Sequence, residues 1–269
     1  MKIACPWGQA YAYTGGRPWV AGQPTVLLIH GVLNDHSVWI LQSRYLAHHG
    51  ANVLAVDLPG HGRSTGQPCA SIEAYAAALL QCLQAAGVTQ AAVAGHSMGS
   101  LIGLEMAAQA PQCISRLALV GTAYPMRVAP PLLQAAQDDP PRAMAMVNTF
   151  SHSTLAPPPS ALGPGTWTYG ALDALMKRVL ASNREHNVFA QGFLACDSYQ
   201  GAPDAAAKVQ CPVRLVLGKR DQMTPPKAAA SLQAALPQAD TVLVEAGHAL
   251  MTEAPEATLR ALHPWLLSA

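Results

Sequence analysis

The stretch Gly95-His96-Ser97-Met98-Gly99 has the residue types and spacing needed for nucleophilic catalysis. The apolar run Ala91–Ala94 before it is typical of a strand, and the sequence from Ser100 onward is typical of a helix. A serine at such a strand-to-helix turn, a nucleophile elbow, holds its hydroxyl clear of the backbone, and the flanking glycines avoid Cβ clashes. The N–H of the next residue has no intrahelical partner and can stabilise an oxyanion. We therefore predict that Ser97 is a nucleophile.

The composition excludes several classes of partner. The chain has 269 residues, enough for one large α/β domain, with 12% charged residues and a formal net charge of +1. It has no basic cluster, which argues against a nucleic-acid or anionic-membrane surface. No apolar run approaches transmembrane length, and the segment 1–16 lacks the apolar stretch of a signal peptide. We expect a small, weakly charged partner, a cytoplasmic location and no membrane association.

The cysteines and histidines give no indication of a metal site. No His and carboxylate pair has ligand spacing on one predicted helix. The six cysteines are scattered, without a CxxC pair, at Cys5, Cys69, Cys82, Cys113, Cys196 and Cys211. The sequence therefore predicts that the cysteines are buried thiols and that the protein holds no metal and no cofactor.

Strand-like and helix-like segments alternate along the chain. Strands are predicted at 25–30, 52–57, 90–94, 116–120, 213–218 and 241–245, and helices at 35–49, 71–86 and 255–267. An early hairpin is predicted around 11–13, with Gly15-Gly16 as its turn. Because this alternation implies right-handed crossovers, the expected fold class is α/β, with a mostly parallel central sheet and helices on both faces.

The gap between Gly121 and Cys211 is too long for one crossover helix. It carries proline pairs or triplets at Pro130-Pro131, Pro140-Pro141 and Pro157–Pro159, and helical patterns occur at 142–150, 171–182 and 186–199. We interpret 123–210 as an inserted helical cap on a core domain made of 1–122 and 211–269.

Several motifs outside the cap, together with the order of elements, resemble the α/β-hydrolase fold family. The resembling stretches are His30-Gly31 with Trp39 downstream, similar to the oxyanion loop; Asp57–Ser64, similar to the DxPGxGxS turn; Gly218–Asp221, similar to the acid loop; and Ala246-Gly247-His248, similar to the histidine loop. Ser97, Asp221 and His248 keep the family's order of serine, acid and histidine. The resemblance implies that they form a catalytic triad.

Each triad member has a role that its chemistry requires. Serine is a poor nucleophile near neutral pH, so His248 accepts its proton and later returns it to the leaving oxygen. Asp221 orients the imidazole and stabilises its cation. By resemblance, the two oxyanion donors are the N–H groups of Met98 and Val32, with Leu33 as the alternative to Val32.

The remaining polar residues in these motifs have structural interpretations. We expect His96 to be structural or to line the pocket, and His30 and His61 to hydrogen-bond to their own loops. Asp57 is expected to hold its turn. His152, in the cap, is expected to be exposed, since that is the commoner fate of a lone histidine.

The nucleophile narrows the reactions that the resemblance implies. Dehalogenases and epoxide hydrolases of this fold attack with an aspartate, whereas position 97 is serine. C–C bond hydrolases usually carry a Trp after the catalytic histidine, and this chain has Ala249. We therefore favour a carboxylic-ester hydrolase acting through an acyl-enzyme. A C–C bond hydrolase or thioesterase with the same triad, or a small-ligand receptor of the same fold, are the alternatives.

Aromatic and methionine side chains gather in the predicted cap. We expect an apolar, adaptable pocket that prefers uncharged esters with short to medium acyl chains or a small aromatic group. The sequence carries no indication of the oligomeric state. The residues expected to bind substrate are His96, Leu33, Phe150, Trp167, Phe189, Phe193 and Leu250.

Overall fold

A central sheet with the strand order β1-β2-β4-β3-β5-β6-β7-β8 organises the computed structural model, which describes residues 1–154 and 167–268. The pairings of β2 with β1 and with β4 are antiparallel, and those among β3 to β8 are parallel. The strands are β1 (Lys2–Cys5), β2 (Gly8–Tyr13), β3 (Thr25–Ile29), β4 (Asn52–Val56), β5 (Ala91–His96), β6 (Ile114–Val120), β7 (Val213–Gly218) and β8 (Asp240–Val244).

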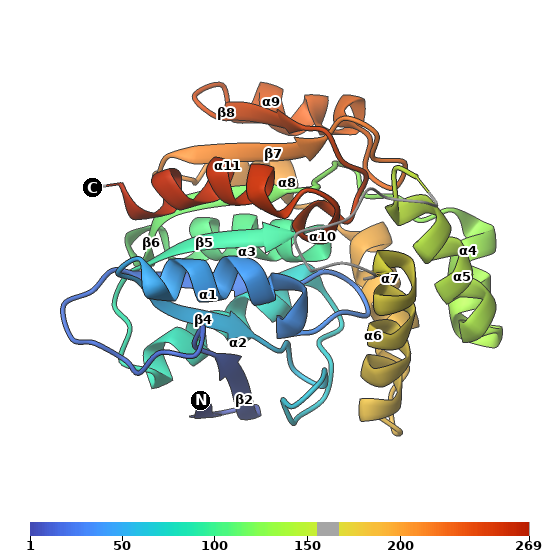
Figure 1. Ribbon diagram of the computed structural model, residues 1–269, viewed down its shortest axis with the longest axis horizontal. Helices are drawn as coiled ribbons and strands as arrows, with labels where there is room; N and C mark the ends of the chain where they lie inside the picture. Colours follow the sequence, from blue (N-terminus) through green and yellow to red (C-terminus); the bar gives the residue numbers. More distant parts are fainter. Residues whose placement is uncertain (155–166, 269) are drawn as a thin grey trace.

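Helices cover both faces of this sheet, as Figure 1 shows for α1 and α11 in front and α2 and α3 behind. The core-domain helices are α1 (Ile40–His48), α2 (Ile72–Ala85), α3 (Met98–Gln109), α9 (Ala230–Ala235), α10 (Leu250–Glu253) and α11 (Pro255–Leu267), with 3-10 turns η1 (His36–Trp39), η2 (Pro111–Cys113) and η3 (Pro226–Ala229). Strand β3 shows why both faces are covered. Leu27 packs in the cluster on the α2 and α3 side and Leu28 in the cluster on the α1 and α11 side, because successive side chains alternate.

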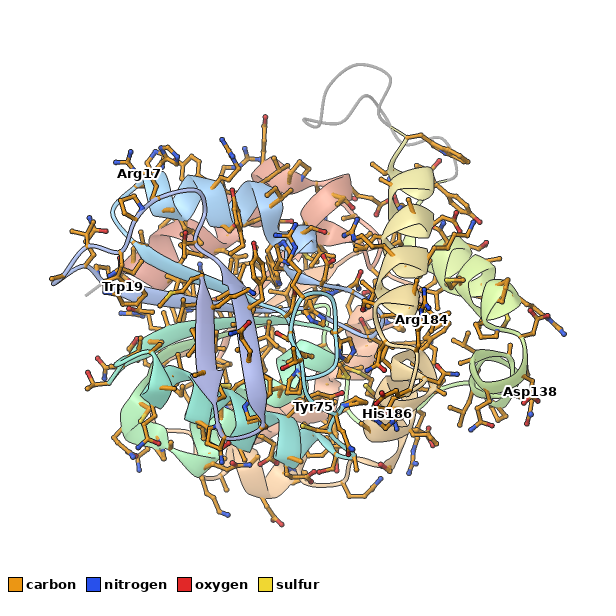
Figure 2. All side chains as sticks on the ribbon, turned by 90° about the horizontal axis from the view of Figure 1, so that it is seen from below. Arg17, Trp19, Tyr75, Asp138, Arg184 and His186 are labelled. Atoms are coloured by element: carbon orange, nitrogen blue, oxygen red, sulfur yellow. The ribbon has the colours of Figure 1, made fainter. Side chains whose placement is uncertain are left out.

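A group of helices is inserted between β6 and β7. They are α4 (Pro130–Asp138), α5 (Pro140–Ser151), α6 (Thr168–Ser182), α7 (Val188–Ser198) and α8 (Ala202–Ala206). Helices α4 to α7 gather beyond the carboxyl ends of the parallel strands (Figure 1). In Figure 2, Asp138, Arg184 and His186 mark this end of the molecule, and Arg17 and Trp19 lie at the opposite end. The predicted Pro157–Pro159 interruption lies outside the described residues.

The structure confirms the predicted fold class, and it differs from the prediction in the bounds of some elements and in one turn. The last helix has the predicted bounds, but the hairpin turn is not Gly15-Gly16. The hairpin joins β1 to β2 through residues 6 and 7, and the two glycines follow β2. Helix α3 starts at Met98, two residues before the predicted start. No helix among the described residues combines the length and apolarity needed to cross a membrane.

Candidate active site

Ser97 occupies a strained turn between β5 and α3. Its φ of 53° and ψ of −121° lie outside the regions that serine ordinarily adopts. The strand and helix cross so closely that a Cβ on Gly95 would lie 1.9 Å from the Gly99 carbonyl oxygen. A Cβ on Gly99 would in turn lie 2.5 Å from the Ile29 carbonyl oxygen. Both glycines are therefore required for the turn that presents Ser97.

His248 and Asp221 form a hydrogen-bonded pair on neighbouring loops. Asp221 follows β7 and His248 follows β8, and the Nδ1 of His248 lies 2.8 Å from Oδ2 of Asp221. Both side chains are buried. Because an ionised carboxylate only accepts hydrogen bonds, Nδ1 carries the proton in the neutral ring and Nε2 is left as the basic nitrogen.

Four donors surround the Asp221 carboxylate. The N–H groups of Met223 and Thr224 donate to Oδ1 at 2.8 Å each, and the Thr224 hydroxyl lies 2.7 Å from Oδ2. Burial opposes the charged form of Asp221. The field of His248 and the hydrogen bonds from His248 and Thr224 outweigh that effect and lower the pKa of the carboxyl from 3.8 to about 2. Asp221 is therefore ionised throughout the neutral range.

His96 is hydrogen-bonded to the backbone of the loop that bears His248. Its Nε2 lies 2.9 Å from the backbone carbonyl oxygen of His248, so Nε2 is protonated and donates. Burial lowers the pKa of His96 to about 3, with His248 adding to the effect, so the ring is neutral. Its buried Nδ1 has no partner among the described residues.

The loop after β3 passes directly over Ser97. A Cβ on Gly31 would lie 3.1 Å from the Ser97 Cβ. The next residue, Val32, lines both of the cavities that reach Ser97. Leu33 has a positive φ of 53°, and its side chain is buried in the core. The backbone of this loop and the start of α3 therefore flank the serine from two sides.

Two cavities meet at Ser97. The first cavity, of about 240 Å³, extends between α6, η1 and α10, and the second cavity, of about 250 Å³, extends toward the loop 126–129 and α4. The residues that line both are Val32, Ser97, Phe193, Met223 and His248. Most of the remaining lining side chains are apolar. Such cavities suit a small, largely uncharged molecule.

A protein-family model described as the alpha/beta hydrolase fold matches residues 24–255. The chain belongs to the alpha/beta hydrolase fold family. This alpha/beta hydrolase is 29% identical to the putative carbamate hydrolase RutD of Enterobacter cloacae over 252 residues, 87% of this chain and 88% of that protein. It is 34% identical to the (E)-2-((N-methylformamido)methylene)succinate hydrolase of Acinetobacter baylyi over 104 residues, which cover 38% of this chain and only 39% of that protein.

Solved structures of the same fold cover the whole chain. The enol-lactonase from Burkholderia xenovorans LB400 has a TM-score of 0.83 at 21% identity, and the match covers 100% of both chains. The esterase from Exiguobacterium antarcticum has a TM-score of 0.84 at 18% identity, with 99% of both chains covered. At these identities the likeness establishes the fold of the hydrolase and nothing finer.

The predicted substrate-binding residues of this alpha/beta hydrolase separate into two groups. His96, Phe189 and Phe193 line the first cavity, and Phe150 and Phe193 line the second. The structure places Leu33, Trp167 and Leu250 outside both linings. Leu33 and Leu250 are fully buried in the core, whereas Trp167 is 62% exposed and stacks on Tyr169.

Several lining residues were missed by sequence reasoning. Thr224 follows Asp221 by three residues, a spacing typical of side-chain to backbone turns, and that signal was available. Val147 and Arg178 carry no such signal, because their place in the first cavity depends on how α5 and α6 pack.

The structural interpretations of the other histidines are confirmed except for His152. His30 Nδ1 and His61 Nδ1 bond to the carbonyls of Gly31 and Pro59, in their own loops. His152 is buried instead of exposed, because its Nδ1 reaches back one helical turn to the Asn148 carbonyl.

Among the residues that the structure describes, one group of side chains has the residue types of a metal site. Asp35, His36 and Asp57 place ligand-type atoms within 4.8 Å of one another. Asp57 already accepts from the His36 backbone N–H, the His36 Nδ1 and the Arg63 N–H, as expected for a residue that holds its turn. Asp35 accepts from Ser37 and Arg178. These bonds explain the cluster without a metal.

Proposed function

We propose that this protein is a serine hydrolase that cleaves a small, largely apolar carboxylic ester through an acyl-enzyme on Ser97. The observation that carries the proposal is the pairing of His248 Nδ1 with the ionised Asp221 beside a serine held in a strained elbow. This pairing leaves Nε2 of His248 as a base, and Ser97 and His248 line the same cavities. A nucleophile, a base and a residue that orients the base are the parts that acyl transfer requires.

In the first half-reaction, Oγ of Ser97 attacks the ester carbonyl carbon while its proton passes to Nε2 of His248. The carbonyl oxygen becomes an oxyanion, for which we propose the N–H groups of Met98 and Val32 as donors. Val32 is favoured over Leu33 because Val32 borders both cavities and Leu33 is turned into the core. Losing one such donor costs roughly 10²- to 10³-fold in rate.

Collapse of the tetrahedral intermediate breaks the bond between the carbonyl carbon and the alkoxy oxygen. His248 returns the proton to that oxygen, and the alcohol leaves. Water then attacks the acyl-enzyme with His248 again acting as base, and the carboxylic acid and free Ser97 are regenerated.

The inserted helices are proposed to act as a cap, within 123–210, over this reaction centre. Helices α5, α6 and α7 supply Val147, Leu172 and Phe189 to the first cavity, and α4 supplies Leu132 to the second. Because the cap provides apolar walls over Ser97, it is expected to set which esters are accepted.

The names of the relatives are compatible with this chemistry. An ester, an enol-lactone and a carbamate each present a carbonyl carbon that bears a heteroatom leaving group, so the same attack applies to all three. We favour the ester because the cavities are mostly apolar, and a panel of all three classes compares them directly.

The proposal is tested with p-nitrophenyl esters and a serine-reactive phosphonate. We expect a burst of p-nitrophenol followed by steady turnover, and a single phosphonate adduct at Ser97 by peptide mass spectrometry. Absence of turnover across the panel, or an adduct at another residue, would contradict the proposal. Ligand-dependent stabilisation without turnover would favour a receptor.

A further inference from the structure

The backbone on both sides of His248 is held by residues outside the histidine loop. On one side, the Gly247 N–H donates to a carboxylate oxygen of Glu253. On the other side, the Ala249 N–H donates at 2.9 Å to the carbonyl of Ser151, the last residue of α5. The position of the proposed base therefore depends on Glu253 and on the end of α5, and neither belongs to the proposed triad.

The Glu253 carboxylate joins these two supports to each other. Its second oxygen accepts from the Ser153 N–H at 2.7 Å and from the Ser153 hydroxyl at 2.9 Å. Because Ser153 lies two residues after the end of α5, one carboxylate fixes the end of this helix against Gly247. In the described ranges, 1–154 and 167–268, no cation forms an ion pair with Glu253. Its described partners are therefore two backbone N–H groups and one hydroxyl.

The local sequence places this carboxylate beside the histidine loop. The one-turn helix α10 begins two residues after His248 and ends at Glu253, and the Glu253 N–H donates back to the Ala249 carbonyl at 2.9 Å. This turn brings the side chain at position 253 back to Gly247. Glycine is required at 247, since a Cβ there would lie 2.7 Å from the Ser151 carbonyl oxygen and 2.9 Å from Oε2 of Glu253. The histidine loop, α10 and the end of α5 are thus closely packed at this point.

We propose that Glu253 is a positioning residue for the base His248, and that it couples the end of α5 to the histidine loop. The inference rests on the proposed hydrolysis at Ser97. Removing the carboxylate leaves the N–H groups of Gly247 and Ser153 without a partner, so the loop loses one support directly and the support from α5 loosens. Because a displacement of about 1 Å can cost roughly 10²-fold in rate, the loss should fall on proton transfer from Ser97 to Nε2 of His248.

The test compares Glu253→Ala with Glu256→Ala, using p-nitrophenyl butyrate and a serine-reactive phosphonate. Glu256 is a matched control, because it lies three residues on, is exposed on α11, pairs with Arg260 at 3.7 Å and lines neither cavity. In Glu253→Ala, kcat and the rate constant for phosphonate labelling of Ser97 should both fall roughly ten- to a hundredfold, while KM changes by less than about threefold. Glu256→Ala should keep the wild-type values.

Glu253→Gln is the conservative variant. Its amide oxygen can accept from the Gly247 N–H while its NH2 group donates to the Ser153 hydroxyl, so only the Ser153 N–H loses its partner. The losses in kcat and in labelling rate should therefore be about three- to tenfold, the cost of one hydrogen bond. This variant also carries the test if Glu253→Ala does not fold, with urea unfolding as the check, and wild-type rates in it would then overturn the inference.

Proton NMR reports the position of His248 independently of turnover. The Nδ1 of His248 lies 2.8 Å from Oδ2 of Asp221, and the resonance of the proton between them is identified by its absence in His248→Ala. If the loop moves, the geometry of this hydrogen bond changes. The resonance should therefore shift in Glu253→Ala and keep its wild-type position in Glu256→Ala, whereas a general loss of stability would leave it in place.

The outcomes separate this inference from the proposed function. In Glu253→Ala, an unchanged kcat, an unchanged Nδ1 resonance, or a loss that Glu256→Ala matches would overturn the positioning role. A rise in KM alone would also overturn it, because Glu253 would then shape the cavity instead of the base. If a folded wild type neither hydrolysed the esters nor reacted with the phosphonate, the proposed function would fail, and the resonance would still show whether Glu253 positions His248.

Discussion

The Nε2 of His96 donates a hydrogen bond of 2.9 Å to the backbone carbonyl of His248. The residue before the proposed nucleophile therefore fixes the backbone of the proposed base. Two more hydrogen bonds hold the same loop. The Ala249 N–H donates to the Ser151 carbonyl, and the Gly247 N–H donates to the Glu253 carboxylate. His248 is thus tied to the elbow and to the end of α5 at once.

Replacing His96 with phenylalanine should lower kcat by roughly ten- to a hundredfold, with a smaller change in KM. The ring is kept but the donor is lost, so the His248 backbone can shift relative to Ser97. Because the pKa of His96 is lowered to about 3, the variant should keep the shape of the wild-type pH profile across the neutral range. Steady-state kinetics of His96→Phe and His96→Gln check this. Equal loss in both would contradict a role for the donated hydrogen bond.

Ser97→Ala should lower kcat by roughly 10⁴-fold or more with the fold retained, because the substitution removes only a hydroxyl at a turn. His248→Ala should cost a similar factor, and the double variant should be little worse than either, since the groups act as a unit. Circular dichroism controls for folding. Ester hydrolysis near the wild-type rate in Ser97→Ala would show that another residue attacks.

Asp221 should make stability depend on pH in the acid range. Its pKa is lowered from 3.8 to about 2, so its contribution is fully present above 3.8 and is lost as the pH falls from there toward 2. That contribution is up to about 2 kcal/mol. Urea unfolding across this range should show a steeper loss for the wild type than for Asp221→Asn. If the free energy of unfolding depended on pH equally in the two proteins, this prediction would be wrong. The variant should also lose roughly 10³- to 10⁴-fold in kcat at neutral pH.

The fold and the proposed triad could be predicted from sequence because their determinants are local. The elbow needs glycine at 95 and 99, where a Cβ would lie within 2.5 Å of a carbonyl oxygen, and the strand before it is apolar because both faces of the sheet are covered. The loops bearing Asp221 and His248 follow the buried strand β7 and the edge strand β8, and the parallel pairing of these two strands brings both loops to one edge of the sheet.

The inserted helices were predicted in part. The segments 142–150, 171–182 and 186–199 correspond to α5, α6 and α7, but α4 was not predicted. Pro130 and Pro140 are each the first residue of a helix, where the missing N–H costs nothing. The cavity face of α5 could not be chosen from sequence. Met146 and Phe150 line the second cavity and Val147 and Ser151 line the first, but both pairs have the same helical spacing, and only the packing of the helix shows which cavity each pair meets. Trp167 illustrates the same limit, since it stacks on Tyr169 at the surface instead of turning inward.

Thr224→Val should reduce kcat about tenfold while Thr224→Ser stays near the wild type. The hydroxyl lies 2.7 Å from Oδ2 of Asp221 and 3.1 Å from Nδ1 of His248, so it helps to orient both partners. The hydroxyl oxygen also lies 3.0 Å from the Gly121 carbonyl oxygen, and because its single proton pairs with one buried acceptor at a time, losing the hydroxyl removes one buried hydrogen bond at a cost of about 1–3 kcal/mol. Kinetics and urea unfolding of both variants separate the two effects. A loss of stability without a change in kcat would mean that the threonine only supports the loop.

The charge of Arg178 is balanced by Asp35, and this pairing predicts how the first cavity treats anionic substrates. Asp35 is buried, which opposes its charged form, but hydrogen bonds from Ser37 and Arg178 lower its pKa below the ordinary value. The carboxylate is therefore ionised at neutral pH. The wild type should prefer p-nitrophenyl butyrate over the hemisuccinate, because the carboxylate of the hemisuccinate loses hydration without gaining an unpaired cation.

Asp35→Asn should leave the positive charge of Arg178 without its carboxylate partner. The amide oxygen can still accept from the Ser37 N–H, as Oδ1 of Asp35 does at 2.8 Å, so the loop keeps its cap while Arg178 becomes an unbalanced cation beside the first cavity. The kcat/KM ratio of hemisuccinate to butyrate should then rise about fivefold, corresponding to roughly 1 kcal/mol for a solvent-accessible pair. The gain should shrink at high salt and vanish in Asp35→Asn/Arg178→Gln. If the double variant kept the gain, the charge of Arg178 would not be its source, and the side chain would serve only to fasten α6 to the loop bearing Asp35.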